Sequence, residues 1–88
     1  YAHARYNLDN TLVMQVELEK AGDEFEVVIQ IEPDSTLALY NLGVLRMRQE
    51  RLAEASSWLE RAVASDPEFE DARRHLETVQ RALENSDP

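Results

Sequence analysis

The sequence predicts an all-α fold: a stack of antiparallel helix hairpins with about five helices. Three observations predict it. The chain nearly repeats itself at an offset of 34 residues, apolar residues recur at helical spacing, and two prolines stand at matching places in the two copies. A fixed period of about 20–50 residues is typical of stacked repeats. No stretch alternates polar and apolar residues, so no sheet is expected.

The repeat is clearest in the tripeptide Tyr-Asn-Leu, which occupies residues 6–8 and again residues 40–42. Six further positions are identical at the same offset: Ala4 and Ala38, Gln15 and Gln49, Leu18 and Leu52, Ala21 and Ala55, Glu26 and Glu60, Pro33 and Pro67. We therefore divide a single domain, residues 1–88, into a first unit (2–33), a second unit (36–67) and a capping helix (70–84).

The helix boundaries follow from local chemistry. The residue before a proline is disfavoured in the α conformation, so helices should end just ahead of Pro33 and Pro67. The segment Asp34-Ser35-Thr36 offers side-chain oxygens that can cap the next helix. The expected helices span residues 2–15, 18–31, 36–48, 52–65 and 70–84.

Apolar spacing supports the later helices. In the last one, Ala72, Leu76, Val79 and Leu83 form one stripe, and the opposite face is charged, as expected where no further helix follows. The second unit has equivalent faces, formed in its first helix by Leu39, Leu42 and Leu45 and in its second by Leu52, Ala55, Leu59, Ala62 and Val63.

These features resemble the tetratricopeptide repeat, whose pattern combines Leu-Gly, a later alanine and a closing proline with several large apolar or aromatic positions. The second unit carries Leu39, Leu42, Gly43, Arg46, Ala55, Leu59, Ala62 and Pro67 at those places, and the first carries Leu8, Leu12, Ala21, Phe25, Val28 and Pro33. The resemblance implies that the hairpins form a right-handed superhelical stack. It also implies that Gly43 and Ala55 are small because the two helices of the unit approach closely there.

The first unit departs from this pattern. Asp9 stands where the second unit has Gly43, and Val16 occupies a turn position that often holds glycine. Val28 is larger than its counterpart Ala62. We expect the first unit to be more loosely packed and less stable than the second.

Composition excludes several classes of function. A formal charge of −9 argues against nucleic acid, which is bound through clustered Lys and Arg. Without cysteine there is neither a disulfide nor a thiolate metal site, and a cytoplasmic location is expected. No apolar run is long enough for membrane insertion. The chain starts at Tyr1, already in helical pattern, and we interpret it as a piece of a longer protein.

The resemblance implies that the first helix of each unit lines a concave groove that binds an extended peptide. By position, the peptide-binding residues would be Tyr6, Asn7, Asn10, Leu37, Tyr40, Asn41, Val44, Arg48, Arg74 and His75. A side-chain amide offers one donor and one acceptor to a peptide group, which favours Asn7 and Asn41 as contacts. These amides could instead bond a neighbouring helix or water. A clamp for a C-terminal carboxylate is disfavoured, because Asp71 and His75 stand where it needs basic residues.

We therefore predict a noncatalytic protein–protein interaction module with a protein or peptide partner. No cofactor and no metal are expected, since His3 and His75 lack ligand spacing. One alternative is a structural or self-assembly segment of a longer repeat protein, which docks on another copy or on neighbouring repeats through the apolar first unit. This unit carries Val13, Met14, Val16, Val27, Ile29 and Ile31. Another is an appendage of an enzyme, such as a glycosyltransferase, whose chemistry lies elsewhere.

Overall fold

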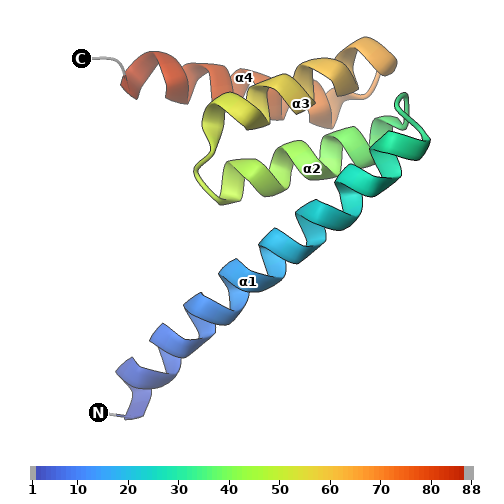
Figure 1. The fold of residues 1–88 in the computed structure, drawn as a ribbon. Helices are drawn as coiled ribbons and strands as arrows, with labels where there is room; N and C mark the ends of the chain where they lie inside the picture. The colour runs from blue at the N-terminus through green and yellow to red at the C-terminus, as the bar shows by residue number, and fades with distance from the viewer. Residues whose placement is uncertain (1, 87–88) are drawn as a thin grey trace.

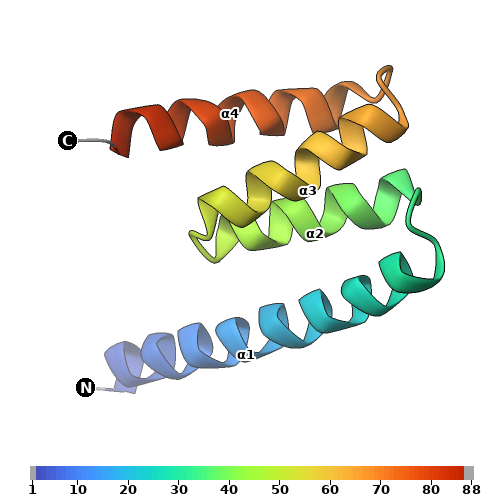
Figure 2. The same ribbon diagram turned by 45° about the horizontal axis from the view of Figure 1, so that its top comes forward.

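The computed structural model describes the backbone of residues 2–86 and the side chains of residues 13–85 (Figure 1). This part of the chain forms four helices and no strand: α1 (Ala2–Ile31), α2 (Thr36–Arg48), α3 (Leu52–Ser65) and α4 (Glu70–Ser86). Consecutive helices pack against each other, and the N-terminal part of α1 extends away from the other three (Figures 1 and 2). None of the described helices combines the length and apolar character needed to cross a membrane.

Helix α1 corrects the expected helix count. Two helices, 2–15 and 18–31, were predicted in the first unit, but residues 2–31 form one uninterrupted helix. The hairpin expected within residues 2–33 is therefore absent, and there are four helices in the described chain rather than five.

The turn between α2 and α3 explains the difference. Glu50 adopts a left-handed backbone conformation with φ of 62°. The Arg51 N–H donates to the Arg46 carbonyl and the Glu50 N–H to the Met47 carbonyl, both at 2.9 Å, which is the Schellman pattern that ends a helix. The residue equivalent to Glu50 in the first unit is Val16. A β-branched side chain is strongly disfavoured at positive φ, so the chain continues as a helix through residue 16.

Helices α2 and α3 form the close hairpin that the second unit predicts. A Cβ atom added to Gly43 would lie 2.7 Å from Cγ of Leu59, closer than real Cβ contacts allow. Ala55, Leu59 and Ala62 are completely buried in α3. The expectation that Gly43 is small because the helices approach closely is thus confirmed, and Ala55 is fully buried in the same hairpin.

The core continues through this hairpin into α4 and α1. Leu42 and Ala62 share a buried cluster with Ala72 of α4 and with Ile29 of α1. A second cluster joins α3 to Val79 of α4. The apolar stripe predicted for the last helix therefore faces the core, as expected of a helix with one apolar side.

The cap predicted before α2 is present. The Ser35 hydroxyl accepts a hydrogen bond from the Ala38 N–H at 3.4 Å. Ser65, at the end of α3, donates to the Asp34 carbonyl at 2.7 Å and lies 2.7 Å from the Thr36 hydroxyl. The loop before α2 is thereby tied to the end of α3.

Replacing Gly43 with alanine should destabilise the fold by about 1–3 kcal/mol, because the new methyl group would overlap Leu59. Helix propensity alone predicts the opposite sign, a gain of up to about 1 kcal/mol. Urea unfolding followed by circular dichroism distinguishes the two. Ser57→Ala, on the exposed face of α3, is the control and should change stability by less than about 0.5 kcal/mol.

Candidate functional site

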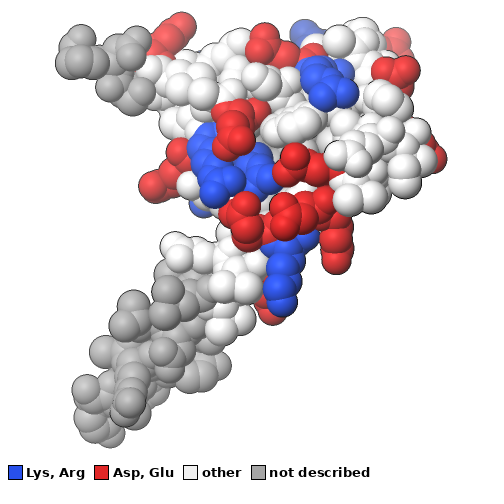
Figure 3. All heavy atoms as spheres, viewed as in Figure 1, with Lys and Arg blue, Asp and Glu red and all other residues white. Residues whose placement is uncertain are grey.

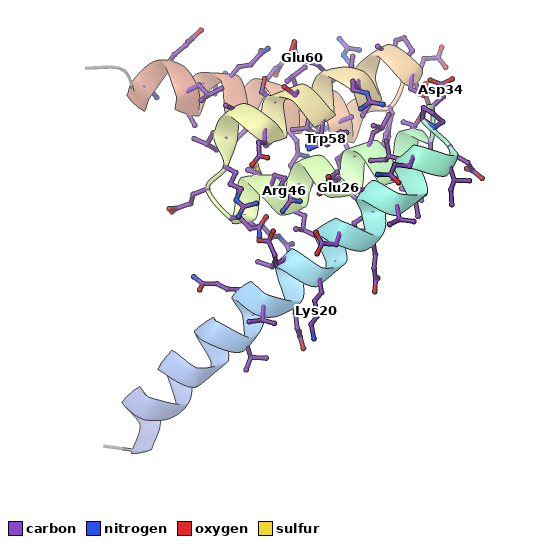
Figure 4. The ribbon with its side chains drawn as sticks, in the orientation of Figure 1. Lys20, Glu26, Asp34, Arg46, Trp58 and Glu60 are labelled. Carbon is purple, nitrogen blue, oxygen red and sulfur yellow. The ribbon has the colours of Figure 1, made fainter. Side chains whose placement is uncertain are left out.

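A buried arginine fixes α1 against α2. Arg46 is only 4% exposed, and its guanidinium donates to Glu26 at 2.7 Å and to Gln49 at 2.8 Å. Glu19 lies 3.5 Å away on the same helix as Glu26. A Cβ atom at Gly22 would come within 3.0 Å of the guanidinium nitrogens, so the glycine makes room for it. Figure 4 shows Arg46 and Glu26 pointing toward one another between the two helices.

Glu19 extends this contact to the α2–α3 turn. It accepts a hydrogen bond from Gln49 at 2.9 Å and pairs with Arg51 at 3.2 Å. The hydrogen bond from Gln49 is the main cause that lowers the pKa of Glu19; partial desolvation opposes it, and the charges of Arg51 and Arg46 reinforce it. Acidic and basic side chains accordingly gather where α1 meets α2 and α3 (Figure 3).

Beside this network lies a groove between α1 and α2, which we call the α1–α2 groove. Its volume is about 300 Å³, and it is lined by Leu18, Phe25, Asn41, Val44, Leu45 and Arg48. A more polar hollow of about 430 Å³ adjoins it, sharing Leu18 and Arg48, and is also lined by Gln15, Glu19, Gln49, Glu50 and Arg51. The groove therefore combines an apolar lining with one amide and one guanidinium.

The groove exists because α1 does not fold back on itself. Leu18 and Phe25 correspond to Leu52 and Leu59, and Leu59 is fully buried in the α2–α3 hairpin. In α1 no helix of the first unit folds back over these positions, so their side chains line the groove. The sequence pattern places none of Leu18, Phe25 and Leu45 in a site: it assigns Leu45 to an apolar helix face, and Leu18 and Phe25 only to the repeat. The signal that could have shown their role is Val16, which disfavours the turn.

The structure brings part of the predicted peptide-binding set together. Asn41, Val44 and Arg48 line the α1–α2 groove. Tyr40 and His75 meet between α2 and α4, with ring centroids 5.3 Å apart in an edge-on arrangement.

The Tyr40–His75 pair has a defined hydrogen-bonding character. His75 Nδ1 lies 2.8 Å from the Asp71 carbonyl and 3.4 Å from the Tyr40 hydroxyl. Since a carbonyl only accepts, Nδ1 carries the proton, and the hydroxyl hydrogen of Tyr40 remains available to another acceptor. Burial, and secondarily the charge of Asp71, raises the pKa of Tyr40, which keeps this hydroxyl protonated.

Among the remaining predicted residues, the two whose side chains are described, Leu37 and Arg74, do not line this groove. Leu37 is exposed near the start of α2, and Arg74 points outward from α4, 3.9 Å from Glu70. The side chains of Tyr6, Asn7 and Asn10 lie outside the described residues. Among the described residues, no group of three or more His, Cys, Asp or Glu side chains is placed to hold a metal ion.

A helix hairpin with a small residue at its closest approach, in a sequence that repeats at an offset of 34 residues, is typical of a class of helical repeat proteins. The family described as "Tetratricopeptide repeat" matches residues 12–78, which is more than half of the chain. The chain belongs to the tetratricopeptide repeat family. Members of this family are in general noncatalytic protein–protein interaction modules. A comparison with curated proteins gives no match.

The lowered pKa of Glu19 makes stability depend on pH. The folded state binds this proton less readily than the unfolded state, so Glu19 stabilises the fold above its ordinary pKa of 4.5. This contribution is lost as the pH falls through the lowered pKa of the folded state. Glu19→Gln should therefore show a smaller drop in the free energy of unfolding between pH 7 and pH 3, measured by urea titration. Parallel losses in the two proteins would contradict the assignment.

Glu26→Ala should destabilise the fold by about 1–2 kcal/mol. A hydrogen bond to a charged group contributes about 1.5–3 kcal/mol, and the value is reduced here because Glu26 is itself partly exposed. The matched control is Glu84→Ala, an exposed position in α4, which should stay within about 0.5 kcal/mol of the wild type. Thermal or urea unfolding of both variants measures the difference, and equal stabilities would refute the role of Glu26.

Proposed function

We propose that this chain is a noncatalytic interaction module that holds a peptide segment of a partner protein in the α1–α2 groove. In this proposal the helices belong to a right-handed superhelical stack, and the groove lies on its concave side. The observation that carries the proposal is the lining itself, in which Leu18 and Phe25 of α1 face Asn41 and Arg48 of α2. We place this function in the cytoplasm, since a chain without cysteine needs no oxidising compartment.

The lining specifies the chemistry of the ligand. The Asn41 amide can donate to and accept from one peptide group, without regard to sequence. Arg48 is exposed and can bind a carboxylate through two parallel hydrogen bonds. Leu18 and Phe25 favour an apolar side chain. The ligand is therefore a short segment with an apolar anchor beside one acidic group. It carries no more than one such group, because a protein of net charge −9 repels a strongly acidic peptide.

Other predicted residues extend this site. The hydroxyl of Tyr40, held beside His75, offers a donor on the side of α2 toward α4. Tyr6, Asn7 and Asn10 remain proposed contacts for the same peptide. Leu37 and Arg74 are left out of the proposed site, because they do not line the groove.

A second candidate function is self-assembly through α1. Five large apolar side chains of this helix are each more than half exposed: Val13, Met14, Val16, Val27 and Ile31. Large exposed apolar side chains that cluster at the two ends of one helix favour an interface there.

A displayed peptide library tests the peptide-binding proposal. Selected peptides should share an apolar residue near an Asp or Glu, and calorimetry should show binding weakened about 5–10-fold by Asn41→Ala and by Arg48→Ala, which corresponds to about 1–1.4 kcal/mol each. Arg74→Ala is the matched control and should bind as the wild type does. If Arg74→Ala weakens binding while Arg48→Ala does not, the groove is not the site.

A further inference from the structure

The outward side of α1 carries a stripe of residues at helical spacing. Its apolar members are between 52% exposed, at Val27, and 75% exposed, at Ile31. Lys20 and Glu24 stand in the middle of the stripe, and Figure 4 shows Lys20 pointing away from α2. We call this set the outer stripe: Val13, Val16, Lys20, Glu24, Val27 and Ile31.

The other end of the helix stack is different. The outward face of α4 carries charged residues, among them Arg74, Glu77 and Arg81, all of which are exposed. Such a charged face is stable when it is exposed to solvent, so α4 does not need another helix packed against it. The outward face of α1 instead carries exposed apolar residues at both ends of the stripe, with the charged residues Glu17, Lys20, Asp23 and Glu24 between them.

The outer stripe is nearly symmetric about residue 22. Val13 and Ile31 lie nine residues on either side of this centre, and Lys20 and Glu24 lie two residues on either side. Val16 lies six residues before it, matched by Val28 six residues after it, and Val28 is also exposed. An antiparallel copy of the same helix would therefore set Val13 against Ile31, Val16 against Val28 and Lys20 against Glu24, and it would set Val27 against Glu17.

We propose that the outer stripe binds the outer stripe of a second copy of this chain, with the two α1 helices antiparallel in a two-fold symmetric dimer. This inference deepens the self-assembly function proposed above and rests on it. Val13 packs against Ile31 of the second copy, and the interface is isologous, so every contact occurs twice.

Charge selects the antiparallel arrangement. Lys20 is the only lysine of the chain and the only basic residue between residues 6 and 45. Within the described residues, neither Lys20 nor Glu24 takes part in an ion pair. Two copies of net charge −9 repel each other, and two Lys20–Glu24 pairs across the interface offset part of that repulsion. A parallel pair would instead place Lys20 beside Lys20.

The dimer leaves the peptide site open. The α1–α2 groove is lined by Leu18 and Phe25 of α1. Lys20, in the middle of the outer stripe, points away from α2 (Figure 4), and the other members of the stripe share its face by helical spacing. Dimer formation and peptide binding can therefore be measured separately.

Sedimentation equilibrium over a wide concentration range tests whether the dimer forms. The wild type should be a dimer at high concentration, and Val27→Glu should weaken association at least about tenfold, because it places an unpaired carboxylate from each copy in the interface. Leu37→Glu is the matched control, since Leu37 is exposed and apolar but lies on α2. A wild type that stays monomeric overturns both the dimer and the self-assembly function, and leaves the peptide-binding proposal untouched.

Charge exchange and cross-linking test the register. Lys20→Glu and Glu24→Lys should each weaken the dimer, and the double variant should restore it.

Because the chain has no cysteine, Val13→Cys mixed with Ile31→Cys should form a disulfide-linked dimer, whereas either variant alone should not. In the antiparallel dimer the two Val13 positions are about 27 Å apart, too far for a disulfide. Two outcomes would overturn the antiparallel register but not self-assembly. One is cross-linking of Val13→Cys alone, and the other is association that Val27→Glu weakens but the charge changes do not.

Discussion

The position of α1 depends on a buried guanidinium. Arg46 occupies a place where the repeat pattern has an aromatic residue, and because its side chain is almost completely removed from water, its charge must be compensated. Glu26 and Glu19 supply that compensation from α1, and Gly22 supplies the space between them. Apolar contacts such as Ile29 add to the attachment, but the charges determine how α1 lies along α2.

The α1–α2 groove is a consequence of that attachment. The polar network holds one end of the helix pair and the Ile29 cluster holds the other, so Leu18 and Phe25 face Asn41 and Arg48 without closing on them. A first unit folded as a hairpin would place its own helix beside these residues. The open groove therefore depends on an uninterrupted α1 as much as on its lining.

Helix α1 thus contributes residues to two different surfaces. Its side toward α2 forms the groove, and its outward side carries the outer stripe. The three later helices form the close-packed part of the fold, in which Gly43, Leu59 and Ala72 leave little freedom. The family fold is built in the second unit and α4, whereas the proposed interactions all involve α1.

The second unit and the last helix could be predicted from the order of the residues alone. The helices expected at 36–48 and 52–65 coincide with α2 and α3, because prolines, caps and apolar spacing act over a few residues. The course of α1, the burial of Arg46 and the lining of the groove became visible only in three dimensions. Those features join residues far apart in the chain, such as Glu26 and Arg46, and local patterns do not say which distant charges will meet.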